Sequence, residues 1–241
     1  MLRRFPLRRL RLPLGGGSLS LVVPDAAAWM RRGDWAAATV GGAEPPYWVQ
    51  IWPASVAVAQ LLWRFGSLAG LRVLDLGCGL GVPGVAACRA GAAVTFADRQ
   101  PDALAFATWN GSRQGGAVAP VAHQFDWGQQ DLREPCDLLL LADVSYRHVH
   151  HAALRRHVDA CLAADGVVVH ADPCRRESTP FVRWLRERLR VLEVVRPTSF
   201  QERRLDVRLC VGARTPALLV PWQRALGLAA VADEPLAAPP S

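Results

Sequence analysis

The sequence predicts an α/β protein in which one mostly parallel, doubly wound sheet carries helices on both faces. Apolar runs typical of buried strands alternate with helix-like segments from residue 72 onward, and several runs end at an aspartate. A glycine-rich turn joins the first run to the helix behind it. Such alternation gives parallel strands with right-handed crossovers and places ligands at the carboxyl ends of the strands. The 241 residues, 51% of them hydrophobic, suffice for one packed core of this Rossmann-like, seven-stranded kind.

Residues 1–46 are expected to form an N-terminal extension packed on this core. Arginine and leucine alternate over residues 9–12, and glycines 15–17 separate them from the apolar residues 19–23, which predicts a β-hairpin. Pairs of glycines at 41–42 and prolines at 45–46 close the extension. The start has no long apolar core and no small-residue cleavage site, so it is not a secretory signal. Its Arg-rich, acid-free composition is also found in some organelle-targeting segments, and that is the alternative to the hairpin, which we favour.

The core domain is expected over residues 47–213. Its first helix, at 54–65, carries apolar residues at helical spacing, and the helix at 101–110 has proline at its first position. Between them we expect a strand at 72–76, a helix at 81–89 and a strand at 93–97. A third strand is expected at 118–122.

The second half of the domain begins with the run DLLLLA at residues 137–142. A continuous apolar run of this length is typical of a central strand that is buried on both faces. A helix at 149–163, a strand at 166–171 and a helix at 179–189 follow, and strands at 191–196 and 205–211 are expected as an antiparallel edge. The tail, residues 214–241, is expected to be partly disordered.

A glycine loop between two carboxylates is the most informative motif. Asp75 lies at the end of the first strand, and Gly77, Gly79 and Gly81 follow it. Asp98 ends the next strand, at the distance where an acid binds ribose hydroxyls in nucleotide-binding half-sites. The glycines allow the backbone to approach a ligand closely.

The carboxylate of Asp75 at the mouth of the loop would repel a pyrophosphate and attract a cation. S-adenosylmethionine carries an ammonium and a sulfonium and no phosphate, so the motif indicates this cofactor. A nicotinamide or flavin nucleotide is the weaker alternative. A ligand-free turn would explain the glycines but not the two acids at strand ends.

Two more acids follow strand ends at the same rim. Asp126 and Trp127 suit an adenine ring, through a bond to its amine and packing on its face, although a capping Asp with a core Trp is the alternative. Asp143 and Tyr146 follow the 137–142 strand and face the reactive methyl group in this architecture. We expect Asp143 to hold an incoming ammonium and Tyr146 to screen it. A strand-end Asp that caps the next helix is again the alternative.

The segment PYWVQIWP at residues 46–53 is dense in aromatics. Trp52 is expected to pack over the cofactor, and Tyr47 and Trp48 are expected to wall an acceptor channel. Core packing explains any one of them equally well.

The composition indicates which binding partners and which cellular compartment to expect. The formal net charge is +7, but every basic side chain is Arg, there is no Lys, and the charges are scattered, so we do not expect a nucleic-acid partner. The six cysteines show no CxxC spacing, which predicts neither a metal site nor a redox pair and favours a reducing cytoplasm. No apolar run is long enough to span a bilayer.

Taken together, PYWVQIWP, VLDLGCGLG, Asp98, the FDW at 125–127 and the DxxY at 143–146 resemble the seven-β-strand protein-lysine methyltransferases. The nearest branch resembles the electron-transfer-flavoprotein β-subunit lysine methyltransferase. The resemblance covers about residues 18–212 and implies a protein lysine as acceptor, near Asp143 and Tyr146. It implies cofactor contacts at Trp52, Asp75, Gly77, Gly79, Asp98, Trp127 and Asp143. A small-molecule or nucleic-acid methyltransferase and a non-catalytic cofactor-binding module remain as alternatives.

Overall fold

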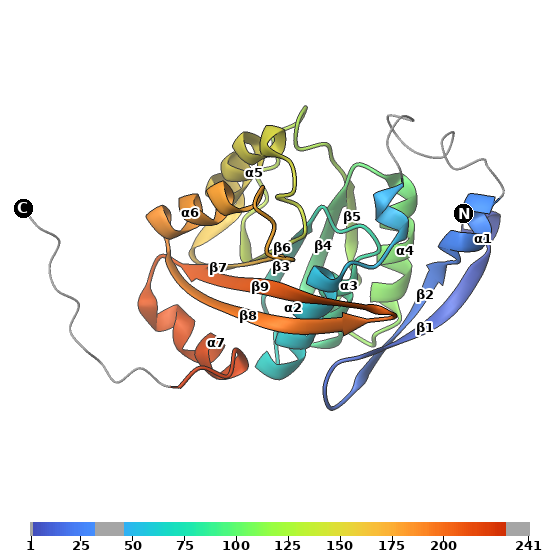
Figure 1. The fold of residues 1–241 in the computed structure, drawn as a ribbon, viewed down its shortest axis with the longest axis horizontal. Coiled ribbons are helices and arrows are strands. Elements are labelled where there is room, and N and C mark those ends of the chain that lie inside the picture. The colour runs from blue at the N-terminus through green and yellow to red at the C-terminus, as the bar shows by residue number, and fades with distance from the viewer. Residues whose placement is uncertain (1, 32–45, 230–241) are drawn as a thin grey trace, which may run out of the picture.

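The computed structural model describes residues 2–31 and 46–229. The predicted α/β class is confirmed (Figure 1). The strands are β1 (Leu7–Pro13), β2 (Ser18–Pro24), β3 (Arg72–Leu76), β4 (Ala93–Asp98), β5 (Val121–Gln124), β6 (Cys136–Ala142), β7 (Leu162–Asp172), β8 (Arg190–Phe200) and β9 (Arg203–Ala213). The helices are α1 (Ala26–Arg31), α2 (Pro53–Phe65), α3 (Val82–Arg89), α4 (Pro101–Ser112), α5 (His148–Cys161), α6 (Thr179–Arg188) and α7 (Val220–Ala225), with 3-10 turns η1 (Leu2–Arg4), η2 (Tyr47–Val49) and η3 (Pro216–Leu219).

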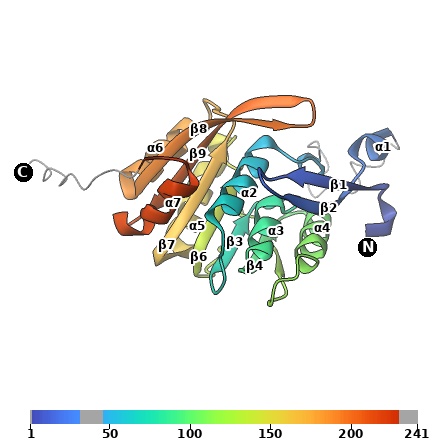
Figure 2. The ribbon, with the colours of Figure 1, turned by 90° about the horizontal axis from the view of Figure 1, so that it is seen from below.

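The large sheet has seven strands in the order β5-β4-β3-β6-β7-β9-β8. Pairing is parallel from β5 to β7, and β9 is antiparallel to both of its neighbours. The last pair between β7 and β9 joins Asp172 to Arg208, whereas β9 begins at Arg203. The tip of the β8–β9 hairpin therefore extends beyond the end of the sheet (Figure 2).

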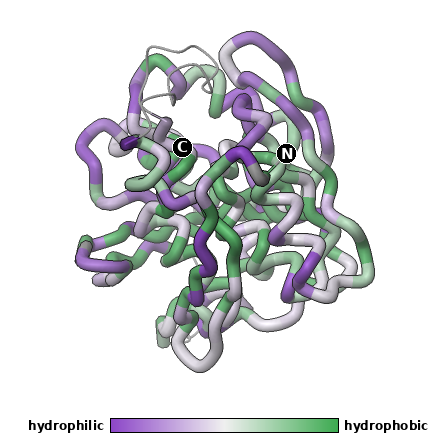
Figure 3. Tube along the Cα trace, turned by 90° about the vertical axis from the view of Figure 1, so that its right-hand side faces the viewer, coloured by the Kyte–Doolittle hydropathy of each residue, from purple (hydrophilic) through white to green (hydrophobic). Residues whose placement is uncertain are grey.

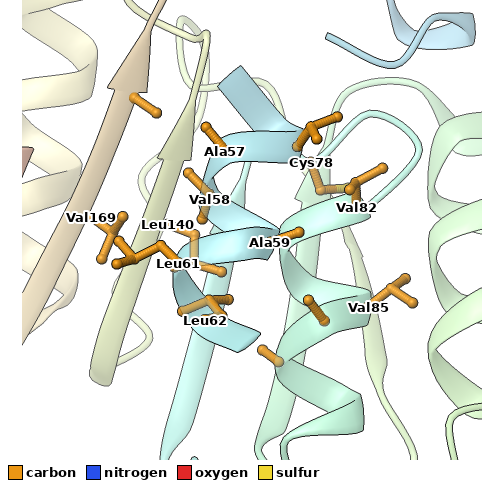
Figure 4. Close-up of a cluster of buried hydrophobic side chains, with 14 of the residues drawn as sticks. Ala57, Val58, Ala59, Leu61, Leu62, Cys78, Val82, Val85, Leu140 and Val169 are labelled. Atoms are coloured by element: carbon orange, nitrogen blue, oxygen red, sulfur yellow. The ribbon is translucent and has the colours of Figure 1, made fainter. Parts of the chain in front are cut away.

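The central strand β6 is buried on both faces because its leucines alternate between two cores. Leu138 and Leu140 belong to the core beneath α2, α3 and α4, and Leu139 and Leu141 belong to the core beneath α5 and α6. Figure 4 shows the first of these cores, where side chains of α2 and α3 converge on β6 and β7. Hydrophobic segments run through the inside of the trace, and many hydrophilic segments lie at its outer turns (Figure 3). The DLLLLA run thus forms the strand that it predicts.

The predicted N-terminal hairpin is also confirmed, as β1 and β2 pair antiparallel with Leu10 opposite Leu21. Asn110 of α4 fixes it, because its side chain accepts from the Val22 N–H at 2.8 Å and donates to the Val22 carbonyl at 2.9 Å. The expected closure of the extension at residues 41–42 and 45 lies outside the described residues.

The expectation for the third strand is wrong. The third strand is Val121–Gln124 rather than 118–122. Pro120 has no N–H to give to a ladder, and the register sets Val121 opposite Thr95, so the strand begins after the proline. Residues 214–229 of the predicted tail form η3 and α7, and Trp222 of α7 packs on Phe65 at 4.2 Å between ring centroids. The remainder of the tail, residues 230–241, lies outside the described residues.

Within the described residues, no helix has the length and apolar character that crossing a membrane requires.

Candidate active site

One pocket gathers the ends of β3, β4 and β6 with the segment that precedes α2. Most of the predicted site residues line it: Trp52, Asp75, Gly77, Gly79, Asp98, Asp126, Trp127, Asp143 and Tyr146. Gly81 does not line it. The structure therefore brings together residues that are spread from 52 to 146 in the sequence, as the strand-end argument predicts.

The three loop glycines are needed for different reasons, although all have positive φ. A Cβ at Gly77 would lie 2.7 Å from the Trp127 ring, so this glycine lets the indole pack on the loop. At Gly81 a Cβ would lie 2.5 Å from Cβ of Ala107, so this glycine allows α3 to approach α4. Gly79 has no atom within 3.4 Å of its Cβ position, so its φ of +51° alone favours glycine there.

Asp75 is a buried carboxylate with little compensation. Its Oδ2 accepts a hydrogen bond from the Gly84 N–H at 2.9 Å, near the start of α3. Burial raises the pKa of Asp75 to about 7, against the effect of this bond, and the nearby Asp98 carboxylate adds to the rise. A cation bound here would remove the cost of ionising it.

Asp98 ends β4 and braces the glycine loop. Its Oδ2 accepts from the Gly79 N–H at 2.8 Å and its Oδ1 from the Gln100 N–H at 2.9 Å. Burial raises the pKa of Asp98, while both bonds act in the opposite direction. A carboxylate offers about four acceptor positions, so both oxygens can still accept a ligand hydroxyl.

Asp126 and Trp127 have separate roles. Asp126 caps its own turn, since Oδ1 accepts from the Gly128 N–H at 2.9 Å, which is the capping alternative weighed for it. It lines the pocket all the same. The Trp127 ring lies against Gly77 in the pocket wall, where a flat ligand ring can pack on it.

Asp143 carries an ion pair that sequence reasoning missed. Arg175, which follows β7, donates from Nε to Oδ1 at 3.1 Å and from Nη2 to Oδ2 at 3.2 Å. Burial raises the pKa of Asp143, and the guanidinium acts against that shift. Arg175 is itself held by Asp172, whose side chain accepts a hydrogen bond from the Arg175 backbone N–H. Both carboxylate oxygens of Asp172 also accept hydrogen bonds from the guanidinium of Arg208 on β9. Arg175 lies just past a predicted strand end, which was the available signal.

Tyr146 brings the loop after β6 against the aromatic segment before α2. Its ring lies 6.3 Å from Tyr47 and 6.4 Å from His150, measured between centroids. His150, in the first turn of α5, also lines the pocket and was missed, although it lies only four residues after Tyr146. Trp48 lines the pocket too, but it packs with Phe5 and Trp29 in the core rather than only walling a channel.

A doubly wound sheet with a D-x-G-x-G-x-G loop, an acid ending the next strand and this pocket defines a class I S-adenosylmethionine-dependent methyltransferase. Residues 47–187 match the lysine methyltransferase family, and the chain belongs to that family. The family resemblance seen in the sequence is thus confirmed.

Similar sequences include protein N-lysine methyltransferase METTL21A of Danio rerio, which is 35% identical over an alignment of 153 residues that covers 60% of this chain and 69% of the relative. The electron transfer flavoprotein β-subunit lysine methyltransferase of Danio rerio is 32% identical over 55% of this chain and 52% of its own length. Histone-arginine methyltransferase METTL23 of Xenopus laevis is 34% identical over 42% of this chain and 45% of its own. The match thus spans about half the length of the last two.

Solved structures share the fold. The N-methyltransferase NodS of Bradyrhizobium japonicum, in complex with S-adenosyl-L-homocysteine, is 20% identical, with a TM-score of 0.52 over 66% of this chain and 84% of its own. Magnesium protoporphyrin IX methyltransferase of Synechocystis with bound S-adenosylmethionine is 19% identical, with a TM-score of 0.52 over 65% of this chain and 77% of its own.

The residues present fit S-adenosylmethionine as the cofactor of this enzyme. Asp75 offers a buried carboxylate whose charge a cationic ligand would stabilise, and Asp98 offers two hydroxyl-accepting oxygens. When bound, the cofactor supplies a methyl group on a positively charged sulfur.

Proposed function

We propose that this chain transfers methyl groups from S-adenosylmethionine to lysine side chains of a protein partner. One observation carries the proposal. The segment that matches the lysine methyltransferase family, residues 47–187, contains every residue that lines the pocket, from Tyr47 to His150. We further propose residues 47–213 as the catalytic domain and residues 1–46 as an extension packed on it.

The cofactor end of the pocket is assigned to the glycine loop and its two acids. Asp75 faces the ammonium of the methionine part, Asp98 accepts from the ribose hydroxyls, and Trp127 packs on the adenine. Gly77, Gly79 and Gly81 shape the loop, Asp126 holds the turn beside the adenine, and Trp52 covers the methionine part.

The acceptor end is assigned to Asp143 and Tyr146, which follow β6. An amine must be neutral to attack a methyl group, and a free lysine has a pKa near 10.4. Desolvation among Tyr146 and the neighbouring rings would lower that pKa, and the walls would position the neutral nitrogen for its attack on the methyl group.

Incubation of the protein with isotopically labelled S-adenosylmethionine and a lysate lacking its activity tests the proposal. Tandem mass spectrometry should find the label on lysine of a protein. Label that passes entirely through a small-molecule filter would refute it. The METTL23 match, 34% identical over 107 residues, makes protein arginine the second candidate acceptor, and the same spectra distinguish the two residues.

We also propose that the enzyme acts in the cytoplasm on a protein rather than on a nucleic acid. The six cysteines are free thiols, five of them buried, which fits a reducing compartment. Fractionation of the native cells would check the compartment.

A further inference from the structure

The outer edge of the N-terminal hairpin carries an arginine motif that the proposed function does not use. Within the described residues β1 pairs only with β2, and β2 lies between β1 and α4 (Figure 2). Leu7, Arg9 and Arg11 alternate along β1 and are all exposed. The strand begins close to the pocket, because Phe5 packs against Trp48 of the pocket wall at 5.8 Å between ring centroids.

The ladder of the hairpin determines which backbone groups of β1 face outward. The Leu14 N–H donates to the Gly17 carbonyl at 2.9 Å, so these two opposite residues form a hydrogen-bonded pair. Bonded and non-bonded pairs alternate along an antiparallel ladder. Leu7, Arg9 and Arg11 therefore direct their N–H and C=O groups away from β2. An edge of this kind is a template on which another strand can pair.

The rest of the fold covers the other edge of the hairpin but only one end of this edge. Asn110 binds both backbone groups of Val22, which lies opposite Arg9 on β2. On the β1 edge, Gln60 donates to the Pro13 carbonyl at 3.3 Å, near the turn. Among the described residues, none bonds the outward backbone groups of Arg9, so these groups are available to a ligand.

The side chains give this edge a positive charge. Val22 and Ser20 lie opposite Arg9 and Arg11, and within the described part of the chain no carboxylate pairs with either guanidinium. The Arg11 Nε–H donates to the neutral Ser18 Oγ at 2.7 Å. A second copy of this chain is a poor occupant, because pairing two such edges would set arginine against arginine. The charge favours an acidic occupant instead.

Resting on the proposed protein partner, we propose that β1 binds an extended acidic segment of that partner as an added strand. A residue that forms a hydrogen-bonded pair with Arg9 directs its side chain to the same face as Arg9. The segment therefore carries acids at alternate positions, one opposite Arg9 and one opposite Arg11. Backbone hydrogen bonds provide affinity, and the two charge pairs provide the specificity.

Titration of the full chain with a blocked hexapeptide of alternating Glu and Thr, followed by amide NMR, tests the pairing. The backbone N–H signals of Leu7, Arg9 and Arg11 should shift most. A peptide of three Thr followed by three Glu has the same composition and charge, and it should bind at least about fivefold more weakly because its acids do not alternate. Equal affinities of the two peptides, or shifts confined to other residues, would overturn the proposal.

N-methylated peptides distinguish strand addition from general charge attraction. In the proposed register the Glu N–H groups face β1 and the Thr N–H groups face away from it. Methylation of the Glu nitrogens should weaken binding at least about tenfold, whereas methylation of the Thr nitrogens should change it less than about threefold. If both methylated peptides bound like the parent peptide, no strand would be added and the proposal would fail.

A pair of double variants locates the charge. Arg9→Gln with Arg11→Gln should weaken binding of the alternating peptide at least about tenfold, because both charge pairs are lost. Arg133→Gln with Arg183→Gln is the matched control, since it removes the same charge from two exposed arginines outside the hairpin. Equal losses in the two double variants would show that net charge alone attracts the peptide, which contradicts the proposal.

Two further outcomes are separable. A thymidine hexanucleotide that shifted the same three signals at a lower concentration than the peptide would assign this edge to nucleic acid and overturn the proposal. No methyl group moves in these titrations, so strand binding can fail while lysine methylation stands. Label recovered only on small molecules would refute the proposed function and leave the measured peptide affinities unchanged.

Discussion

Asp75 and Gly84 meet where β3 ends and α3 begins, with the Gly84 N–H 2.9 Å from Asp75 Oδ2. A Cβ at Gly84 would lie 2.9 Å from that oxygen and 2.3 Å from the Phe96 ring, so glycine allows the helix to approach the carboxylate. One backbone bond compensates only part of the desolvation, which leaves the pKa of Asp75 at about 7. The Asp75 carboxyl group therefore gains or loses its proton near neutral pH.

Cofactor affinity should rise as the pH increases through about 7, because a cationic ligand favours the ionised form of Asp75. Calorimetric titration with S-adenosylmethionine across this range measures the effect. Asp75→Asn should bind weakly at every pH and should lack this dependence. If the variant kept the same pH profile as the wild type, another group would be responsible.

The stability of the unliganded protein should change in the opposite direction. The folded-state pKa of Asp75 lies above the ordinary value of 3.8, so the folded protein holds the extra proton between 3.8 and about 7. The free energy of unfolding should therefore fall as the pH rises through this window. Denaturant melts of the wild type and Asp75→Asn should differ in pH slope there, and parallel slopes would contradict the shift.

Gly77→Ala should weaken the affinity for the cofactor far more than Gly115→Ala does. Both glycines have similar positive φ, 70° and 78°, so the backbone strain, about 1–2 kcal/mol, is matched. The new methyl would lie 2.7 Å from the Trp127 ring at Gly77, whereas nothing lies within 4 Å at Gly115. Tryptophan fluorescence would report displacement of the indole, and equal affinities in the two variants would argue against this packing role.

Asp98→Ala should weaken cofactor binding by about 1.5–3 kcal/mol, because it removes charged-group hydrogen bonds to the ribose. Asp131→Ala is a suitable control, since that carboxylate is 62% exposed and pairs with Arg156 on the surface. Thermal shifts with S-adenosylhomocysteine give the comparison. If S-adenosylhomocysteine raised the melting temperature of Asp98→Ala as much as that of the wild type, Asp98 would not be a cofactor-binding residue.

Asp143→Ala should lower turnover by at least about 100-fold, a barrier increase near 2.7 kcal/mol, because the loop that carries Tyr146 loses its ion pair. Arg175→Met should act through the same pair, so the double variant should cost less than the sum of the single ones. Arg176→Met, one residue away and exposed, is the control. Additive losses in a double-mutant cycle would show that Asp143 and Arg175 act independently.

The parts of the site that local sequence defines could be predicted, and the long-range pairs could not. The loop from Asp75 to Gly81 and the strand of leucines in β6 follow from adjacent residues and their periodicity. The pair between Asp143 and Arg175 joins residues 32 apart, and no local pattern specifies it. The edge strands were predicted as antiparallel, but the position of β9 between β7 and β8 depends on competition between two similar apolar strands.

That position of β9 has a consequence for synthesis on the ribosome. Translation produces β7 and then β8, yet the open edge of β7 is filled by β9, the last strand to emerge. Until Ala213 has left the exit tunnel, β7 lacks the strand that pairs with its second edge, and Asp172 lacks the guanidinium of Arg208. The nascent chain cannot close its sheet before that point, so the Asp172–Arg208 pair, which lies behind Arg175 of the pocket's ion pair, forms only after β9 has emerged.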